Sequence, residues 1–139
     1  MDHALIIRNF ITAIWNNQDF SSIPLFVGPA YRIDLDRGDP WEGKTLDHRE
    51  FEKRLHYTFD SFPDMHFDIL STLSDGDLVA ITWSMTGTNL GKIGNFPPTF
   101  QKIQTSGVTI YRVCNGLVCG HSQVFDRTTV MRQLGFLAQ

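Results

Sequence analysis

The sequence predicts an α+β fold in which helices pack on one face of a curved antiparallel sheet. Three observations lead to this expectation. Helical apolar patterns dominate residues 3–62, alternating strand patterns fill most of residues 65–125, and turn signals separate the strands at hairpin spacing. A group of helices followed by a run of strands is typical of α+β domains. The length suits one domain with a real core, which we expect to span residues 1–139.

Three helices are expected before the main run of strands. Apolar residues three and four positions apart predict a helix over 3–16, and Pro24 suits the first turn of a short helix over 23–26. Asp47 and Glu50 form a capping box that begins the third helix. That helix ends before residue 63, because the residue before a proline disfavours the helical conformation.

Five strands and a terminal helix are expected in the remaining segments. The strands cover 31–35, 65–73, 78–89, 103–113 and 117–125, and a bulge is predicted near Ser106-Gly107. Asn115-Gly116 is the strongest hairpin signal in the sequence. A short helix over 128–134 is stopped by Gly135. One face of strand 78–89 is small and semi-polar, which suits a subunit contact or open solvent.

Charge and hydropathy exclude several classes of partner. The net charge is −3, the pI is about 5.9 and no basic cluster occurs, so we expect no binding to nucleic acid or to anionic membranes. No apolar run approaches the roughly 20 residues that span a bilayer, and the N-terminus does not read as a signal peptide. These features predict a cytoplasmic protein.

The two cysteines flank the Asn115-Gly116 turn. With a two-residue turn, Cys114 faces Leu117 and Cys119 faces Arg112, which makes the cysteines diagonal neighbours and a poor disulfide pair. We therefore expect free thiols in a reducing compartment. The cysteines and the scattered histidines have no zinc spacing, so no metal site is predicted.

Asp126 is the best candidate for chemistry. It follows an apolar strand, where lost solvation raises the pKa of a carboxyl toward the range useful for proton transfer. The alternative is that Asp126 caps the helix that follows. His66, Arg112 and Gln123 are the predicted donors that stabilise an enolate, with His66 and Arg112 placed in the catalytic group. Strict alternation, however, places His121 and Gln123 on the strand face opposite Asp126.

Other catalytic patterns find little support. Gly91 to Gly94 resembles half of a phosphate-binding loop, but prolines follow where a helix is needed. The sequence has no nucleophile elbow. Trp41 lies in a polar loop, where it covers either the mouth of a cavity or the core. The residues predicted to contact a substrate are Trp41, Trp83, Met85, Asn89, Phe96 and Gln123.

Four segments, in the order in which they occur, give the sequence a family resemblance. They are FITAIWNNQDFSSI at 10–23, FPD at 62–64, GTNLG at 87–91 continuing to FPPT at 96–99, and GHSQVFD at 120–126 followed by QLG at 133–135. Together they resemble the SnoaL-like polyketide cyclase family, also called ester cyclases, within the nuclear-transport-factor-2-like superfamily. The resemblance runs through nearly the whole chain.

This resemblance implies a cone-shaped, cystatin-like α+β barrel with a pocket between sheet and helices, and a homodimer formed through the outer sheet face. In the family's polyketide cyclases, an aspartate at the position of Asp126 is the general acid/base of an intramolecular aldol closure. Asn89 replaces the family's usual histidine and Phe100 replaces a glycine. Both lie in the loop expected to roof the pocket, so the substrate stays open.

The function expected from the sequence is cofactor-free acid/base catalysis on a small, largely apolar, carbonyl-bearing substrate. Asp126 removes an activated proton, and a nearby donor stabilises the enolate on which charge develops. The alternative is a small-molecule-binding protein of the same fold without catalysis.

Overall fold

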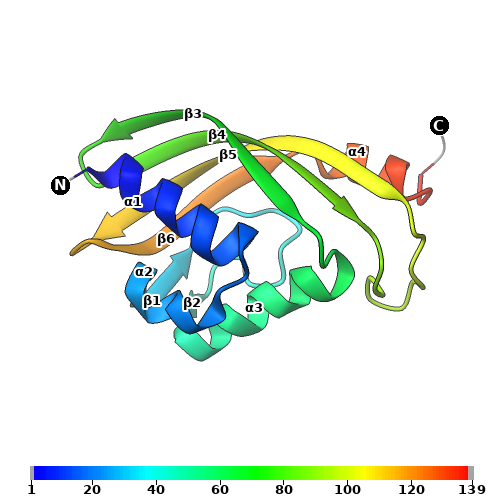
Figure 1. Ribbon diagram of the computed structural model, residues 1–139, viewed down its shortest axis with the longest axis horizontal. Helices are drawn as coiled ribbons and strands as arrows, with labels where there is room; N and C mark the ends of the chain where they lie inside the picture. The colour runs from blue at the N-terminus through cyan, green and yellow to red at the C-terminus, as the bar shows by residue number, and fades with distance from the viewer. Residues whose placement is uncertain (1, 138–139) are drawn as a thin grey trace.

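A six-stranded curved sheet arches over the N-terminal helices in the computed structural model, which describes residues 2–137 (Figure 1). In sheet order the strands are β2 (Thr45–Leu46), β1 (Val27–Ile33), β6 (Leu117–Phe125), β5 (Lys102–Cys114), β4 (Leu78–Thr88) and β3 (His66–Asp75). The sheet does not close into a barrel, because β2 and β3 lie at opposite edges. The α+β class and the curved sheet are confirmed.

The sheet is mixed, so the prediction of a wholly antiparallel sheet is wrong in one respect. β1 runs parallel to β6, while the pairs β3–β4, β4–β5 and β5–β6 are antiparallel. Each antiparallel pair is joined by a hairpin or a single loop. β1 is far from β6 along the chain, so no turn constrains their relative direction.

The helices form as predicted, with one change in the first. They are α1 (His3–Phe10), a π-helical turn (Ile11–Asn16), a 3-10 turn (Phe20–Ser22), α2 (Ile23–Phe26), α3 (His48–Ser61) and α4 (Arg127–Gln133). The capping box of α3 is confirmed, since Asp47 accepts from the Glu50 backbone N–H at 2.8 Å. α3 buries Phe51 and Leu55 as expected, but it also buries Arg54 on the same face.

A bulge in β6 follows the Asn115-Gly116 turn. Val118 pairs with Val113 and Gly120 pairs with Arg112, so Cys119 is an extra residue between two regular pairs. The bulge changes the alternation of β6, and Val118 and His121 are therefore both buried. No irregularity occurs near Ser106-Gly107 in either pairing of β5, so the bulge predicted there is wrong.

The bulge also changes the state of the cysteines. Cys114 and Cys119 form a disulfide with a Cα–Cα separation of 5.8 Å. The prediction of free thiols is wrong, because it assumed regular pairing of Cys119 with Arg112. As the extra residue of the bulge, Cys119 instead lies within bridging distance of Cys114.

The outer edge of β3 is contacted by the N-terminal helix. The side-chain amide of Asn16, the last residue of the π-helical turn, donates to the Phe67 carbonyl at 3.0 Å. Its oxygen accepts from the Phe67 backbone N–H at 2.8 Å. Both backbone groups of an edge-strand residue are thus paired by one side chain.

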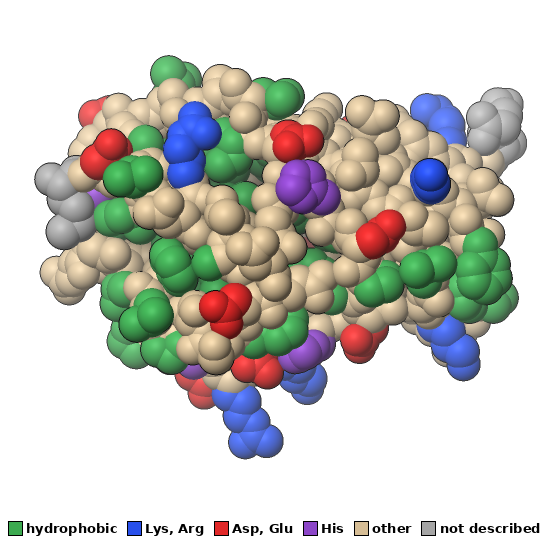
Figure 2. Space-filling view, in the orientation of Figure 1, with side chains coloured by type: hydrophobic (Ala, Val, Ile, Leu, Met, Phe, Trp, Pro, Cys, Tyr) green, Lys and Arg blue, Asp and Glu red, His purple; other side chains and the backbone are tan. Residues whose placement is uncertain are grey.

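The surface carries charges of both signs. On the face shown in Figure 2, Lys and Arg side chains are scattered among acidic, apolar and polar neighbours. Within residues 2–137, no helix combines the length and apolarity needed to cross a bilayer.

Candidate functional site

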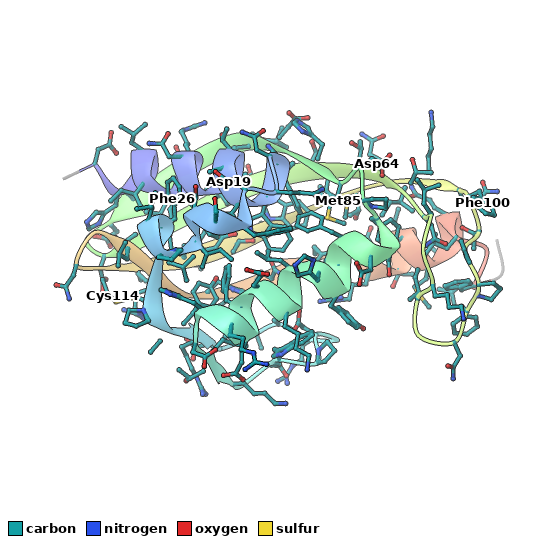
Figure 3. All side chains as sticks on the ribbon, turned by 60° about the horizontal axis from the view of Figure 1, so that its bottom comes forward. Asp19, Phe26, Asp64, Met85, Phe100 and Cys114 are labelled. Carbon is teal, nitrogen blue, oxygen red and sulfur yellow. A yellow bond between two sulfur atoms is a disulfide. The ribbon has the colours of Figure 1, made fainter. Side chains whose placement is uncertain are left out.

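A cavity of about 580 Å³ lies between the concave face of the sheet and the π-helical turn, α3 and α4. Alternation along β4 turns Ile81, Trp83 and Met85 into it. Met85 lies in the layer between sheet and helices (Figure 3). Trp15 contributes to the wall from the helical layer, and Phe125 from the end of β6. A cavity of this size and apolar character suits a small organic molecule.

A cluster of polar side chains interrupts the apolar wall. It consists of Tyr31, Asp36, Arg54, His121 and Gln123, and is called the polar cluster below. His121 is its centre, because its Nε2 lies 2.8 Å from Asp36 Oδ2 and its Nδ1 lies 2.6 Å from the Tyr31 hydroxyl. A carboxylate only accepts hydrogen bonds, so the pattern assigns the His121 proton to Nε2. Nδ1 then accepts from Tyr31.

Asp36 anchors this cluster with its side chain only 1% exposed. Besides His121, Oδ2 accepts from Gln123 Nε2 at 2.9 Å and from Arg54 Nη2 at 3.2 Å. Oδ1 accepts from Arg127 Nη2 at 3.0 Å. Burial alone would raise the pKa of Asp36, but the hydrogen bond from His121 and the nearby positive charges lower it below its ordinary value. Asp36 is therefore a buried carboxylate at neutral pH.

Arg54 has a second acidic partner. Its Nε and Nη2 donate to Asp39 Oδ2 at 3.1 and 2.9 Å. Two carboxylates and two guanidinium groups, those of Arg54 and Arg127, thus meet beside the cavity, and their formal charges cancel. The net charge beside His121 is close to zero when the imidazole is neutral.

The protonation states favour neutral groups at the cavity wall. Burial lowers the pKa of His121, and the charge of Arg54 lowers it further, despite the opposing hydrogen bond to Asp36. Burial raises the pKa of Tyr31 well above its ordinary value and also raises that of Tyr111. At pH 7 the imidazole is neutral and both phenols are protonated.

Gln123 is held by a second line of hydrogen bonds across three strands. Trp83 Nε1 donates to Thr109 Oγ1 at 2.8 Å, and Thr109 donates to Gln123 Oε1 at 2.9 Å. This leaves the Gln123 amide nitrogen to donate to Asp36. The orientation of the amide is therefore set by β4, β5 and Asp36, and Gln123 faces the cavity.

Asp126 lies outside this cavity. Its carboxylate is exposed and caps α4, accepting from the Thr129 backbone N–H at 3.0 Å and from the Thr129 hydroxyl. These two hydrogen bonds lower its pKa. The expected rise in pKa is wrong, because the strand ends before Asp126 becomes buried. A catalytic role for Asp126 stays a prediction, and the geometry supports the capping alternative.

The other two predicted catalytic residues also lie away from the cavity. His66 is exposed on the edge strand β3, 3.3 Å from Asp68. Arg112 is exposed and donates to Asp77 at 3.0 Å beside the β3–β4 turn. Arg112 pairs with Gly120, the residue before His121, but its side chain is exposed whereas that of His121 is buried.

Three of the six predicted substrate contacts line the cavity, namely Trp83, Met85 and Gln123. Trp41 packs edge-on against Tyr57 at 5.2 Å, outside the lining. Phe96 is exposed and packs on Phe136, which does line the cavity.

Asn89 has a structural environment. It is fully buried, donates to the backbone carbonyls of Ser61 and Gly91, and accepts from the backbone N–H and hydroxyl of Thr99. These bonds fasten the loop that begins at Asn89 to the end of α3. The replacement of the family's usual histidine at this position therefore affects the anchoring of the loop, outside the cavity lining.

Sequence reasoning missed Tyr31, Asp36 and Arg54. Arg54 carried a detectable signal, because it lies three residues after Phe51 on the buried face of α3, where a charge requires a partner. Asp36 carried no detectable signal, since it follows a strand in a polar loop that looked solvent-exposed. Within residues 2–137, no three His, Cys, Asp or Glu side chains gather as metal ligands.

Residues 5–134 match the family described as SnoaL-like polyketide cyclase. The chain belongs to this family. A solved structure from Acidithiobacillus ferrooxidans, provisionally described as a polyketide cyclase, is 34% identical with a TM-score of 0.91, and the match covers 99% of this chain and 97% of that one. A comparison with curated proteins finds no match.

Two Streptomyces structures share the SnoaL-like fold. IdmH of Streptomyces antibioticus, also provisionally described as a polyketide cyclase, is 25% identical over 97% of this chain and 99% of its own, with a TM-score of 0.80. AclR of Streptomyces galilaeus, provisionally described as a hydroxylase, is 22% identical over 99% and 83%, with a TM-score of 0.82. Family membership supports a cyclase-type role, while the reaction and substrate are argued below from the site.

Proposed function

We propose that this SnoaL-like protein is an acid/base enzyme of the cyclase type, acting on a small, largely apolar, carbonyl-bearing substrate. Its own side chains supply the acid and the base. The observation that carries the proposal is the hydrogen-bonded relay of Tyr31, His121 and Asp36 at the wall of a largely apolar cavity. Tyr31 and His121 both line that cavity, so a substrate can reach the relay.

The relay accounts for each proton in an intramolecular aldol closure. The Tyr31 oxygen takes a proton from the carbon beside a substrate carbonyl while the Tyr31 proton moves to His121 Nδ1. The imidazolium that forms faces the Asp36 carboxylate 2.8 Å away. The enolate carbon then bonds to a second carbonyl carbon, and the resulting alkoxide takes the proton back through Tyr31. Nothing else is gained or lost by the enzyme.

The pKa shifts of Tyr31 and His121 favour a concerted transfer of the two protons at Tyr31. The raised pKa of Tyr31 disfavours a free tyrosinate, and the lowered pKa of His121 disfavours a lasting imidazolium. A proton that passes through Tyr31 in one step avoids the formation of a free tyrosinate. The lowered pKa of His121 makes the imidazolium return its proton readily, which suits a base that must act later as an acid.

The test uses 2-tetralone, a small apolar ketone with activated hydrogens beside its carbonyl. In deuterated buffer, proton NMR follows the exchange of these hydrogens with and without protein. We expect the protein to accelerate exchange, and both His121→Gln and Tyr31→Phe to lower the acceleration by about 100-fold or more. Saturable binding without acceleration by the unaltered protein would instead support a binding protein.

Asp126→Asn separates the two assignments of the base. If Asp126→Asn abolishes exchange while His121→Gln retains it, the relay is not the acid/base site. If Asp126→Asn retains exchange while His121→Gln abolishes it, the role of Asp126 is to cap α4. Thermal melting of each variant shows whether a loss of exchange is a loss of fold.

A further inference from the structure

Tyr111 presents a hydroxyl that the relay does not use. Its side chain comes from β5, is 6% exposed and lines the cavity. Its ring packs against Phe10 at 5.6 Å and against His121 at 6.1 Å between centroids. Unlike the hydroxyl of Tyr31, the hydroxyl of Tyr111 hydrogen-bonds to no residue within 2–137. A hydroxyl that has no protein partner can donate a hydrogen bond to a ligand that enters the cavity.

Arg54, which also lines the cavity, has a donor that its acidic partners leave unused. Its Nε and Nη2 are bonded to Asp39 and Asp36, but Nη1 donates to none of the described side chains or carbonyls. The Arg54 side chain is nine-tenths buried and lines the cavity. Among residues 2–137, no fully buried side-chain nitrogen or oxygen lacks a partner, so Nη1 and the Tyr111 hydroxyl each keep some accessible surface, and both residues line the cavity.

We propose that the Tyr111 hydroxyl and Arg54 Nη1 form a subsite for the substrate oxygen that becomes the enolate oxygen. Both are donors, and the ring of Tyr111 packs directly on His121, the middle member of the relay. A donor that stays protonated is needed where negative charge develops, and the raised pKa of Tyr111 keeps its proton in place. The role of this subsite in binding an enolate oxygen rests on the proposed function.

The charge around the subsite favours a developing oxyanion over a permanent carboxylate. Arg54 already has Asp36 and Asp39 as partners, so its charge is compensated before a ligand binds. A ketone or ester oxygen approaches without displacing either carboxylate. It then receives two hydrogen bonds that strengthen as charge moves onto it.

The probe is 4-nitrophenol, whose yellow phenolate form imitates an enolate oxygen on an apolar ring. Absorbance titration gives the affinity of phenolate and phenol separately, and nitrobenzene measures binding of the ring alone. We expect Tyr111→Phe to weaken phenolate binding about 10- to 100-fold, the range for a lost hydrogen bond to a charged group. Nitrobenzene affinity should change by less than about twofold, because the hydroxyl does not contact an apolar ring.

Tyr31→Phe is the matched control, since it also removes one buried phenolic hydroxyl. It should lower the melting temperature, because His121 loses a hydrogen bond. Tyr111→Phe should not lower the melting temperature, since its hydroxyl has no protein partner to lose. Equal phenolate affinities in Tyr111→Phe and the unaltered protein would overturn the subsite, as would a melting temperature lowered as much as by Tyr31→Phe.

The outcomes separate this subsite from the proposed function. Binding of 4-nitrophenolate requires no proton transfer through His121. If Tyr111→Phe binds phenolate normally while His121→Gln loses tetralone exchange, the subsite is wrong and the relay stands. If phenolate binding falls in Tyr111→Phe but tetralone exchange does not depend on His121, the subsite stands as a binding feature and the relay is wrong.

Discussion

Four donors converge on the side chain of Asp36, and this one residue sets the charge of its neighbours. It compensates Arg54 and Arg127, orients the Gln123 amide and fixes the proton of His121 on Nε2. A buried carboxylate with this many donors stays ionised although burial alone would neutralise it. Asp36 is therefore a positioning residue, which acts on a substrate through the side chains that it holds, His121 first among them.

The lowered pKa of His121 predicts how the stability of the protein depends on pH. Below the ordinary histidine value of 6.5, an unfolded chain takes up a proton at this position that the folded protein excludes. The free energy of unfolding therefore falls as the pH is lowered from 7 toward 5, by up to about 1.4 kcal/mol per pH unit. Asp36 acts in the same direction at lower pH, since its pKa is also lowered.

Urea unfolding at several pH values measures this dependence. His121→Gln is less stable at pH 7, because Asp36 and Tyr31 lose a partner, but its stability should change less between pH 7 and 5. An equal slope in both proteins would show that other histidines cause the effect.

At the residue scale, sequence reasoning could identify cavity walls but not the polar cluster. Trp83 and Met85 follow from alternation along one strand. Asp36 and His121 are 85 positions apart, and their contact depends on the parallel pairing of β1 with β6. Asp126 looked buried because it follows an apolar strand, but Val124 is 67% exposed on the outer face and the strand ends one residue later.

The β5–β6 hairpin shows how one local irregularity positions the site. Without the bulge at Cys119, a β6 strand that buries Val118 would turn His121 outward. The bulge brings Val118, His121 and Gln123 to the concave side. Local turn chemistry predicted the hairpin correctly, but an Asn-Gly pair fixes only the turn. The bulge and the disulfide depend on the pairing of Arg112 with Gly120 beyond the turn, which no local rule specifies.

Gly107 tests the packing between β5 and its neighbours. A Cβ at this position would lie 2.5 Å from the Phe125 Cβ and 2.7 Å from Trp83 Cζ2. Gly107→Ala should therefore displace two walls of the cavity and lower the free energy of unfolding by about 1–3 kcal/mol. Urea denaturation measures the loss. Gly28→Ala is the control, because Gly28 also lacks a positive φ and its added Cβ would meet only ordinary contacts, at 3.7 Å from the Cys119 Cβ. A Gly107→Ala protein as stable as the unaltered one would contradict the packing argument.

On the scale of the whole molecule, the convex face of the sheet remains open. Leu73, Val108, Ile110 and Val124 lie on it, with exposures of 75%, 45%, 43% and 67%. The register places these side chains on neighbouring strands, since Val108 pairs with Val124 and Ile110 with Ala80. Contiguous apolar surface of this kind marks interaction sites.

We expect this face to form the predicted homodimer. Light scattering coupled to size exclusion should give twice the chain mass of 15.9 kDa for the unaltered protein and one chain mass for Val124→Lys. Leu25→Lys is the matched control, because Leu25 is 73% exposed in α2, away from the convex face. A monomer at micromolar concentration would contradict the prediction.

The π-helical turn that ends at Asn16 has a consequence for solubility. β3 is a ten-residue strand at the rim of the sheet, and a long open rim can template the addition of strands from other molecules. Asn16 forms hydrogen bonds with both the N–H and the carbonyl of Phe67, so these groups cannot pair with an added strand. Residues 3–16 thus hinder fibre-like growth as well as covering the core.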